Sequence, residues 1–177
     1  MTAEHRFGGA LEVRLLRPDD DRSGFESGDI ELDRFFRRYA GQNQFRHHIG
    51  ATYVAVEGER ILGFATVVPG QIEIEDLPAS RKRKLPRYPL PVLRLARLAT
   101  DRSVRGRGVA KILLGTVLRI AREMADTVGC VGAVVDAKPQ AVGFYQRYGF
   151  EAFDVVEGML DSRPQPQTMF LPIGSIP

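Results

Sequence analysis

Arg105-Gly106-Arg107-Gly108-Val109-Ala110 is the stretch that decides the fold of this chain. A strand-like apolar run at residues 92–99 precedes it, and a strongly amphipathic helical pattern at residues 109–124 follows it. Two glycines between a strand and a helix let the backbone pass close to a ligand, and the free N–H groups of the first helical turn point at that ligand. Because the helix dipole favours negative charge at this end, we expect a phosphate-bearing cofactor.

Three phosphate motifs compete for this stretch. A P-loop requires Lys and then Ser or Thr after its last glycine, which the run Val109-Ala110-Lys111-Ile112 excludes. A dinucleotide fingerprint requires a third glycine, which is absent. The pattern Arg/Gln-x-x-Gly-x-Gly/Ala is met by Arg105, Gly108 and Ala110. The hexapeptide alone also leaves open a glycine-rich turn with solvated arginines.

This spacing resembles the pyrophosphate loop of the GNAT family of N-acetyltransferases. A second run, Phe144-Tyr145-Gln146-Arg147-Tyr148-Gly149-Phe150, is similar to the late helix and turn of that family. One helix, one strand and the start of another helix fit between the two motifs. The resemblance covers residues 11–173 and implies an α/β fold, with a central mixed sheet of roughly six to seven strands flanked by helices. It also implies that the fourth and fifth strands splay apart.

Length and composition predict one soluble domain. The 177 residues are enough for a single GNAT domain over residues 1–177, with residues 1–10 as a loose tail. No apolar run approaches the ~20 residues that span a bilayer, and the first residues lack the apolar segment of a secretory signal. We therefore expect no membrane contact and a cytoplasmic location. Cys130 is the only cysteine, which excludes an internal disulfide, and no Cys/His cluster has the spacing of a metal site.

Strand-like runs lie at residues 11–15, 52–56, 61–68, 131–135, 150–155 and 168–171, and Gly58-Glu59 predicts a hairpin turn. In the run 92–99, Arg94 and Arg97 are an odd number of positions apart and cannot share one face of a regular strand. One extra residue near Ala96 would restore a common face, and GNAT proteins have such a bulge in their fourth strand. Alternatively, the strand is buried on both faces and one arginine extends to solvent.

Three helices are expected. The first is capped by Asp29 or Ser27, and its apolar face comprises Leu32, Phe35, Phe36 and Tyr39. The second covers residues 109–124 and ends at Gly129. The third lies between Pro139 and Gly149 and contains Gly143, a position where we expect a close approach.

The resemblance implies acetyl transfer from acetyl-CoA to an amine. Backbone amides around Leu98, Ala99 and Thr100 would then donate to the oxyanion and pair with the pantetheine arm. The pyrophosphate would be held by the amides of the loop, with electrostatic help from Lys111; the loop residues are Arg105, Gly106, Arg107, Gly108, Val109 and Ala110.

Tyr145 is the candidate general acid. Phe144 and Tyr148 are four residues apart and can share the buried helical face, which rotates Tyr145 by about 100° towards the cofactor. A phenol with a pKa of about 10 is protonated at neutral pH and can give a proton to a thiolate. The alternative is that Tyr145 only packs. Asp136 is the candidate general base, or equally a helix cap, and an α-amino acceptor that titrates near pH ~8 needs no base.

Basic residues are unevenly placed, which favours a polyanionic partner such as a nucleic acid. Solvated charge is the alternative. The candidates for nucleic-acid binding are Arg34, Arg37 and Arg38 in the first helix, Arg81, Lys82, Arg83, Lys84 and Arg87 in a polar stretch, and Arg94 and Arg97, which could line the same cleft.

Several further runs resemble the GNAT toxins of bacterial toxin–antitoxin modules. They are Phe25-Glu26-Ser27-Gly28, Leu32-Asp33-Arg34-Phe35, Arg38-Tyr39-Ala40, Gln42-Asn43, Arg97-Leu98-Ala99-Thr100-Asp101, Val135-Asp136-Ala137-Lys138 and Met169-Phe170-Leu171-Pro172. The resemblance implies acetylation of the amino group of aminoacyl-tRNA, which stops translation. The implied partners are charged tRNA, a ribbon-helix-helix antitoxin and a second copy of the chain in a homodimer. A housekeeping GNAT enzyme for a small-molecule or protein amine, and a non-catalytic CoA- or RNA-binding module, are the alternatives.

Overall fold

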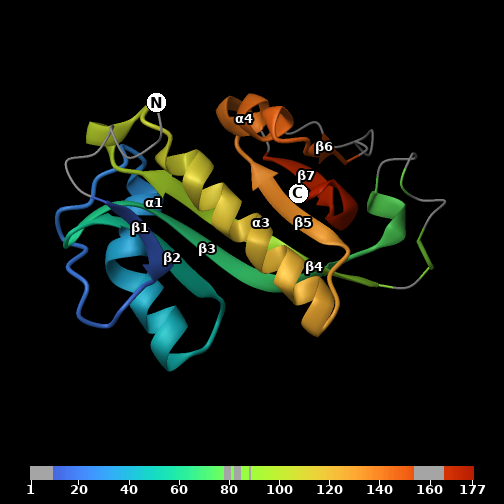
Figure 1. Cartoon of the computed structure of the whole chain (residues 1–177), viewed down its shortest axis with the longest axis horizontal. Coiled ribbons are helices and arrows are strands. Elements are labelled where there is room, and N and C mark those ends of the chain that lie inside the picture. Colours follow the sequence, from blue (N-terminus) through green and yellow to red (C-terminus); the bar gives the residue numbers. More distant parts are fainter. Residues whose placement is uncertain (1–9, 78–80, 82–84, 88, 154–165) are drawn as a thin grey trace. The chain divides into compact units, whose positions relative to one another are not determined.

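A computed structural model describes residues 10–77, 81, 85–87, 89–153 and 166–177 (Figure 1). The chain divides into a first unit, residues 1–68 and 96–117, and a second unit, residues 69–95 and 118–177. Seven strands form a mixed sheet in the order β1-β2-β3-β4-β5-β7-β6, which confirms the predicted α/β fold class. The strands are β1 (Leu11–Leu15), β2 (Ala51–Glu57), β3 (Arg60–Ile72), β4 (Leu90–Thr100), β5 (Gly132–Ala137), β6 (Glu151–Ala152) and β7 (Gln167–Pro172).

The first unit contains the antiparallel strands β1, β2 and the start of β3. The hairpin predicted at Gly58-Glu59 joins β2 to β3, and Gly58 has a φ of +62°. Aromatic side chains fill the core beside these strands. The rings of Phe36 and Phe64 stack with their centroids 4.3 Å apart, and Phe25 meets Phe36 edge-on at 4.9 Å. This aromatic cluster is the surface on which the opening helix is fixed.

The opening helix begins with α1 (Ile30–Arg34) and continues through two π-helical segments, Phe35–Tyr39 and Gln42–Arg46. Of the two predicted caps, Asp29 is the one used: its side chain accepts hydrogen bonds from the Glu31 and Leu32 amides. The prediction that Tyr39 belongs to the apolar face is wrong, because Tyr39 is 46% exposed and Ala40 takes the inward position. A π-helical turn contains more residues than the 3.6-residue period assumed from the sequence.

The first π-helical segment of the opening helix, Phe35–Tyr39, accepts a hydrogen bond from a side chain outside the helix. The guanidinium of Arg22 donates to the carbonyl of Phe36 at 2.8 Å. A Cβ atom at Gly41 would lie only 2.9 Å from this guanidinium, so a side chain at this position would displace the Arg22 guanidinium. Side chains inserted into the helical hydrogen-bond ladder are a recognised cause of such irregular turns.

The second unit contains β5, β6, β7 and the start of β4. Parallel pairing joins residues 93–95 of β4 to residues 133–135 of β5, although β4 continues to Thr100 and β5 to Ala137. β7 pairs antiparallel with both β5 and β6. Val92, Val134 and Phe170 lie in the core of this unit. The bulge expected near Ala96 stays a prediction, and the predicted strand at residues 150–155 is described only as Glu151–Ala152.

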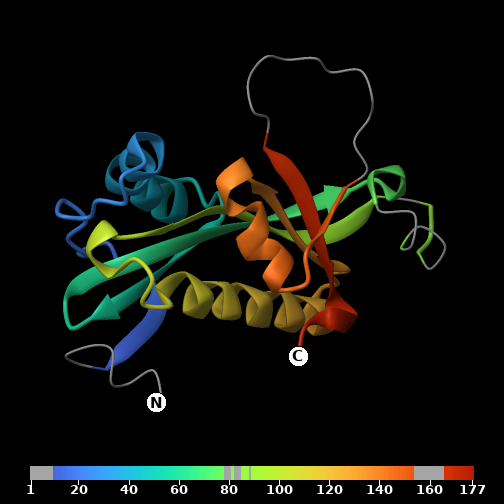
Figure 2. The ribbon, with the colours of Figure 1, turned by 90° about the horizontal axis from the view of Figure 1, so that it is seen from above.

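Two helices follow the motifs found in the sequence. The predicted helix after the glycine loop is confirmed as α3 (Val109–Thr127), which runs as one continuous helix (Figure 2). It ends as expected at Gly129, whose amide donates to the Met124 carbonyl and whose φ is +104°. The helix α4 (Val142–Arg147) follows a short turn, Pro139–Ala141. A Cβ at Gly143 would meet no described atom within 4 Å, so the close approach expected there is not made by these residues.

Candidate active site

The start of α3 presents backbone amides that lack acceptors within the helix. The first intrahelical bond runs from the Ile112 amide to the Gly108 carbonyl at 3.2 Å. The amides of Val109, Ala110 and Lys111 therefore have no carbonyl one turn earlier to receive them. Together with the positive end of the helix dipole, these groups are arranged so that they could donate to an anion through the backbone.

The two glycines of the loop are required by its geometry. Gly106 has a φ of +75° and Gly108 a φ of +87°, a left-handed conformation that residues with a Cβ rarely adopt. Gly63 on β3 is equally constrained, because a Cβ there would lie 2.9 Å from the Ala99 carbonyl and from the side chains of Val109 and Leu113. The helix start is therefore packed closely against the strands that carry it.

Asp101 fixes the connection between β4 and the loop. Its carboxylate accepts hydrogen bonds from the Ser103 amide at 3.0 Å, the Ser103 hydroxyl at 2.6 Å and the Glu26 amide at 3.0 Å. Burial opposes its charge, but these hydrogen bonds and the nearby Arg60 guanidinium outweigh burial and hold the pKa of Asp101 below its ordinary value. The carboxylate is therefore ionised at neutral pH and holds two segments together.

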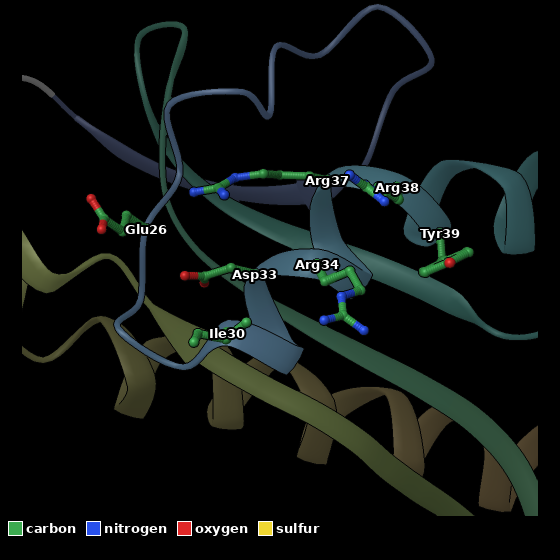
Figure 3. A pocket seen from close by; sticks show the side chains of 7 residues that line it. All are labelled: Glu26, Ile30, Asp33, Arg34, Arg37, Arg38 and Tyr39. Carbon is green, nitrogen blue, oxygen red and sulfur yellow. The ribbon is translucent and has the colours of Figure 1, made fainter.

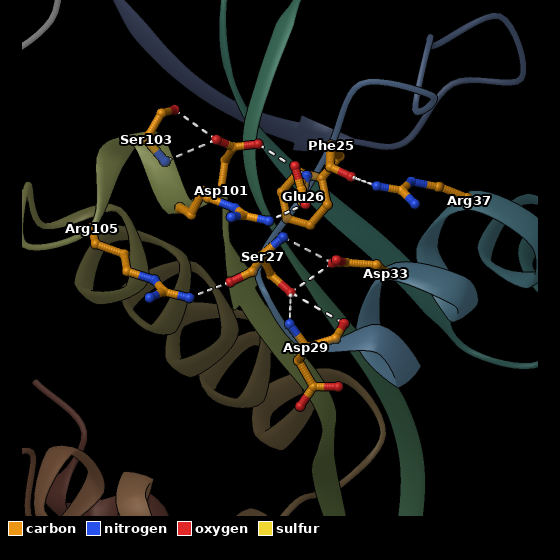
Figure 4. Close-up of polar contacts among 10 residues, drawn as sticks. Phe25, Glu26, Ser27, Asp29, Asp33, Arg37, Asp101, Ser103 and Arg105 are labelled. Atoms are coloured by element: carbon orange, nitrogen blue, oxygen red, sulfur yellow. Dashed lines mark hydrogen bonds and ion pairs between the residues drawn. The ribbon is translucent and has the colours of Figure 1, made fainter.

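The segment at residues 25–29 lies along this connection (Figure 4). The Arg102 amide donates to the Glu26 carbonyl at 2.8 Å, and the Arg102 guanidinium forms an ion pair with the Glu26 carboxylate. The Arg105 guanidinium donates to the Ser27 carbonyl. Because this side chain is engaged with Ser27, the anion-binding capacity of the loop resides in its backbone amides.

Tyr145 is buried within the second unit. Its ring meets Phe144 at 5.1 Å and Phe150 at 5.4 Å, both edge-on, and only 5% of the residue is exposed. Phe144 and Tyr148 are only half-buried, so the prediction that these two form the inward face and Tyr145 its edge is wrong. The Phe150 amide donates to the Tyr145 carbonyl at 3.2 Å, and this turn brings Phe150 against the Tyr145 ring.

The Tyr145 hydroxyl is available to a ligand. Burial raises the pKa of Tyr145 above its ordinary value, so the phenol stays protonated well beyond neutral pH. The hydroxyl has no hydrogen bond to another described residue, and every fully buried side-chain N or O atom in the described part of the chain has a partner. Its oxygen is therefore not completely buried, and it could donate a hydrogen bond to a ligand.

Asp136, the candidate base, is engaged by two neighbours. One carboxylate oxygen accepts from the Arg94 guanidinium at 2.8 Å and the other accepts from the Thr168 hydroxyl at 2.7 Å. The alternative that Asp136 caps a helix is wrong, because the next turn begins after Lys138 and has no side-chain cap. The observed role of Asp136 is to order Arg94 and Thr168.

The predicted basic residues differ in what they contact. Arg81 forms an ion pair with Glu151 at 3.0 Å and Arg94 with Asp136, while Arg37 donates to the Phe25 carbonyl. Arg97 lies over the Phe35 ring, 3.7 Å from its centroid, where desolvation lowers its pKa. Arg34, Arg38 and Arg87 are exposed and have no partner among the described residues, and Lys82, Arg83 and Lys84 lie outside them.

A depression of about 520 Å³ lies beside the opening helix (Figure 3), and it is lined by Glu26, Ile30, Asp33, Arg34, Arg37, Arg38 and Tyr39. The sequence pointed to its arginines. The sequence did not point to Tyr39, because the 3.6-residue period placed this residue in the core. In the structure the π-helical turn exposes residues 37–39 in succession. Within the described residues, no helix is long and apolar enough to cross a membrane, and no group of His, Cys, Asp or Glu side chains could hold a metal ion.

Three solved structures with high similarity to this chain are of the toxin AtaT. AtaT complexed with acetyl-methionyl-tRNAfMet is 27% identical, with a TM-score of 0.82 over 94% of this chain and 97% of that one. AtaTR bound with acetyl-CoA is 28% identical, with a TM-score of 0.76 over 94% and 95%. A mutant of AtaT bound to the C-terminus of the antitoxin AtaR is 25% identical, with a TM-score of 0.75 over 94% and 95%.

Comparison of amino-acid sequences also finds acetyltransferases among the relatives of this chain. The tRNA-acetylating toxin of Mycobacterium tuberculosis is 33% identical over 146 residues, which cover 81% of this chain and 86% of that protein. The model of the acetyltransferase (GNAT) family matches residues 13–150, which include both the glycine loop and the late aromatic helix. The chain belongs to the GNAT family of acetyltransferases.

Proposed function

We propose that this chain transfers the acetyl group of acetyl-CoA to the amino group of an aminoacyl-tRNA and thereby blocks translation. The observation that carries the proposal is the 33% identity, over 81% of this chain, to a relative named for acetylating tRNA. In an acetylated amino group the nitrogen lone pair is delocalised into the new carbonyl, so it no longer attacks a peptidyl ester. The product is therefore unable to accept a growing peptide.

The loop at the start of α3 is the proposed binding site for the coenzyme diphosphate. Free amides at residues 109–111, positive φ at both loop glycines and the helix dipole all favour a bound anion. Lys111 is exposed on the first turn and adds positive charge. The bound AtaTR structure supports acetyl-CoA as the donor.

Tyr145 is the proposed proton donor. The acceptor nitrogen attacks the thioester carbonyl, and the resulting oxyanion accepts a hydrogen bond from a backbone amide among Leu98, Ala99 and Thr100. The C–S bond then breaks and the departing CoA sulfur takes the Tyr145 proton. The acylated nitrogen releases a proton to solvent, and solvent returns one proton to the Tyr145 phenolate, so the enzyme is restored. Tyr145 supplies a hydroxyl that stays protonated because its ring is buried. No side-chain base is needed for an amine that titrates near pH ~8.

Exposed arginines are the proposed contacts to the tRNA backbone. Arg34 and Arg38 in the first unit and Arg87 in the second have no described partner, so their charges are available to phosphates. Lys82, Arg83 and Lys84, which lie outside the described residues, are also proposed to contact the tRNA. Arg81 and Arg94 are weaker candidates because their charges are paired with carboxylates.

We also propose the remaining partners from the toxin relationship. The antitoxin complex of AtaT supports a protein antidote, for which a small ribbon-helix-helix protein is the proposed class. A homodimer is the proposed assembly. The proposed site of action is the cytoplasm, where charged tRNA is used.

The direct test is an incubation with labelled acetyl-CoA. Total charged tRNA, the same tRNA after deacylation, and a mixture of small amines and proteins serve as alternative acceptors. The proposal expects label only in the charged tRNA and expects the Tyr145→Phe variant to lose it. Label in the small-amine or protein sample alone would show a housekeeping acetyltransferase, and an absence of any product would show a non-catalytic module.

A further inference from the structure

The depression beside the opening helix carries positive charge that the protein does not neutralise. Arg34 and Arg38 are exposed and have no ion pair in the described part of the chain. The two carboxylates that line the same depression have their own partners. Glu26 is paired with Arg102, and one Asp33 oxygen accepts both the amide and the hydroxyl of Ser27, at 2.9 Å and 2.6 Å. Three arginines and two carboxylates line the depression, so its lining is cationic overall.

The ring of Tyr39 also lines this depression. Tyr39 is 46% exposed and has no ring or hydrogen-bond partner among the described residues, and Ile30 is 77% exposed at another part of the lining. Figure 3 shows Tyr39 next to Arg34 and Arg38 along the helix. Exposed rings beside unpaired arginines hold single-stranded nucleic acid, because bases stack on the ring while phosphates meet the guanidinium groups. A duplex offers phosphates but keeps its base faces covered.

The side chains at this depression are held on a fixed support. Phe35 and Phe36 are buried in the aromatic core, and residues 37–39 project outward from the π-helical turn between them and Ala40. Arg22 secures that turn through the Phe36 carbonyl. Preorganised side chains lose less entropy when a ligand binds.

We infer that this depression is a binding site for an unpaired nucleotide of RNA, with Tyr39 as the stacking platform and Arg34 and Arg38 as the phosphate contacts. Its volume of about 520 Å³ lies within the range of small-ligand pockets, roughly 300–1,000 Å³. The inference rests on the proposed function in one respect: the RNA is the charged tRNA, and the bound nucleotide belongs to an unpaired part of it.

Binding is tested separately from catalysis. A fluorescently labelled single-stranded RNA pentamer and a blunt-ended RNA duplex are titrated against the full chain, and anisotropy is measured over a range of salt concentrations. The pentamer is expected to bind more tightly than the duplex. Tyr39→Ala is expected to weaken pentamer binding about tenfold or more, whereas Tyr39→Phe, which keeps the ring, stays within about twofold.

The arginine contacts have a salt-dependent signature. Arg34→Gln and Arg38→Gln are each expected to reduce the slope of log affinity against log salt by about 0.7, the value for one phosphate contact to a single strand. Arg119→Gln removes the same charge from an exposed position on α3 that does not line the depression, and it is the matched control. Its slope is expected to equal that of the wild type.

Kinetics separate this inference from the proposed function. With charged tRNA as substrate, Tyr39→Ala is expected to raise KM and leave kcat unchanged. Two results overturn the inference and leave the proposed function standing when the wild type acetylates charged tRNA. One is that Tyr39→Ala binds the pentamer like the wild type, and the other is that the pentamer and the duplex bind equally. If Tyr39→Ala loses the pentamer while charged tRNA is never acetylated, the binding site stands and the proposed function fails.

Discussion

The two units of the chain carry different chemistry. The first unit presents free amides at the start of α3 and unpaired arginines on the opening helix, so its functional groups recognise negative charge. The second unit surrounds the Tyr145 ring with aromatic side chains and pairs Arg81 and Arg94 with carboxylates. The first unit therefore concentrates groups suited to binding anions, whereas the second, in which Arg87 is also exposed without a described partner, holds the candidate proton donor. Residue type alone therefore does not assign a role to an arginine or a tyrosine. The neighbouring residues determine whether its charge or its hydroxyl is free to contact a ligand.

The largest expected effect is in the second unit. Tyr145→Phe removes the hydroxyl and keeps the buried ring, so kcat is expected to fall about 10²–10⁴-fold, the usual contribution of acid catalysis. KM for acetyl-CoA and the melting temperature are expected to change little, since the hydroxyl has no described partner. Steady-state kinetics and a thermal melt check both. An unchanged kcat would assign Tyr145 to packing alone.

The next largest effect is at the anion site of the first unit. Gly108→Glu places a carboxylate where the diphosphate is proposed to bind, at a position with a φ of +87°. Backbone strain and repulsion are expected to weaken acetyl-CoA binding by about tenfold to a hundredfold. The matched control is Gly115→Glu, on the exposed side of α3, where a Cβ meets open space. Calorimetric titration with acetyl-CoA that shows equal affinity in both variants would remove the loop from the coenzyme site.

Asp101→Asn tests whether the Asp101 carboxylate holds the connection between β4 and the glycine loop in place. Loss of the charge-assisted hydrogen bonds is expected to lower the free energy of unfolding by roughly 1–3 kcal/mol at pH 7. The folded-state pKa of Asp101 is depressed, so its stabilisation is present above the unfolded pKa of about 3.9 and is lost as pH falls through the lower folded value. Urea unfolding of both proteins as pH falls below about 4 should therefore show the difference shrinking. A difference that grows in acid would contradict this account.

Arginine substitutions compare the two units directly. Arg34→Gln is expected to weaken charged-tRNA binding several-fold and to reduce its salt dependence. Arg94→Gln is expected to leave binding within about twofold and to cost at most about 1 kcal/mol of stability, because its ion pair with Asp136 is partly exposed. Filter binding of tRNA at two salt concentrations distinguishes them. Equal losses in both variants would erase the distinction between the two units.

The smallest expected effect is at Asp136. The rate is expected to rise with pH until the acceptor α-amino group is neutral, near pH ~8. Asp136→Asn is expected to keep this profile and a rate within about twofold, because both carboxylate oxygens already accept hydrogen bonds. A pH–rate profile that loses its ascending limb in this variant would make Asp136 the general base.

Local backbone structure could be predicted from the sequence, whereas contacts between residues far apart in the chain could not. The position of α3 follows from glycine placement and helical period and is confirmed. The positive φ at Gly106 and Gly108 is a finding of the structure that agrees with the choice of glycine there. The partners of Arg81 and Arg94 lie 70 and 42 residues away, at separations that no local pattern reports.

Two tyrosines were misplaced for a shared physical reason. Tyr39 lies in a π-helical turn and Tyr145 in a helix of six residues that ends at once in a turn. The 3.6-residue period does not hold in the π-helical turn that carries Tyr39. In α4 the period holds only as far as Arg147, and Tyr148, which was used to define the inward face, lies beyond the helix end. Tyr39 was therefore placed in the core and Tyr145 at its edge, the reverse of what is observed.

The most direct test of the central claim is a crystal structure of the protein with CoA. The account predicts diphosphate oxygens within about 2.7–3.2 Å of the backbone nitrogens at the start of α3, with both loop glycines still at positive φ. A diphosphate bound elsewhere on the chain, with these amides facing solvent, would contradict it.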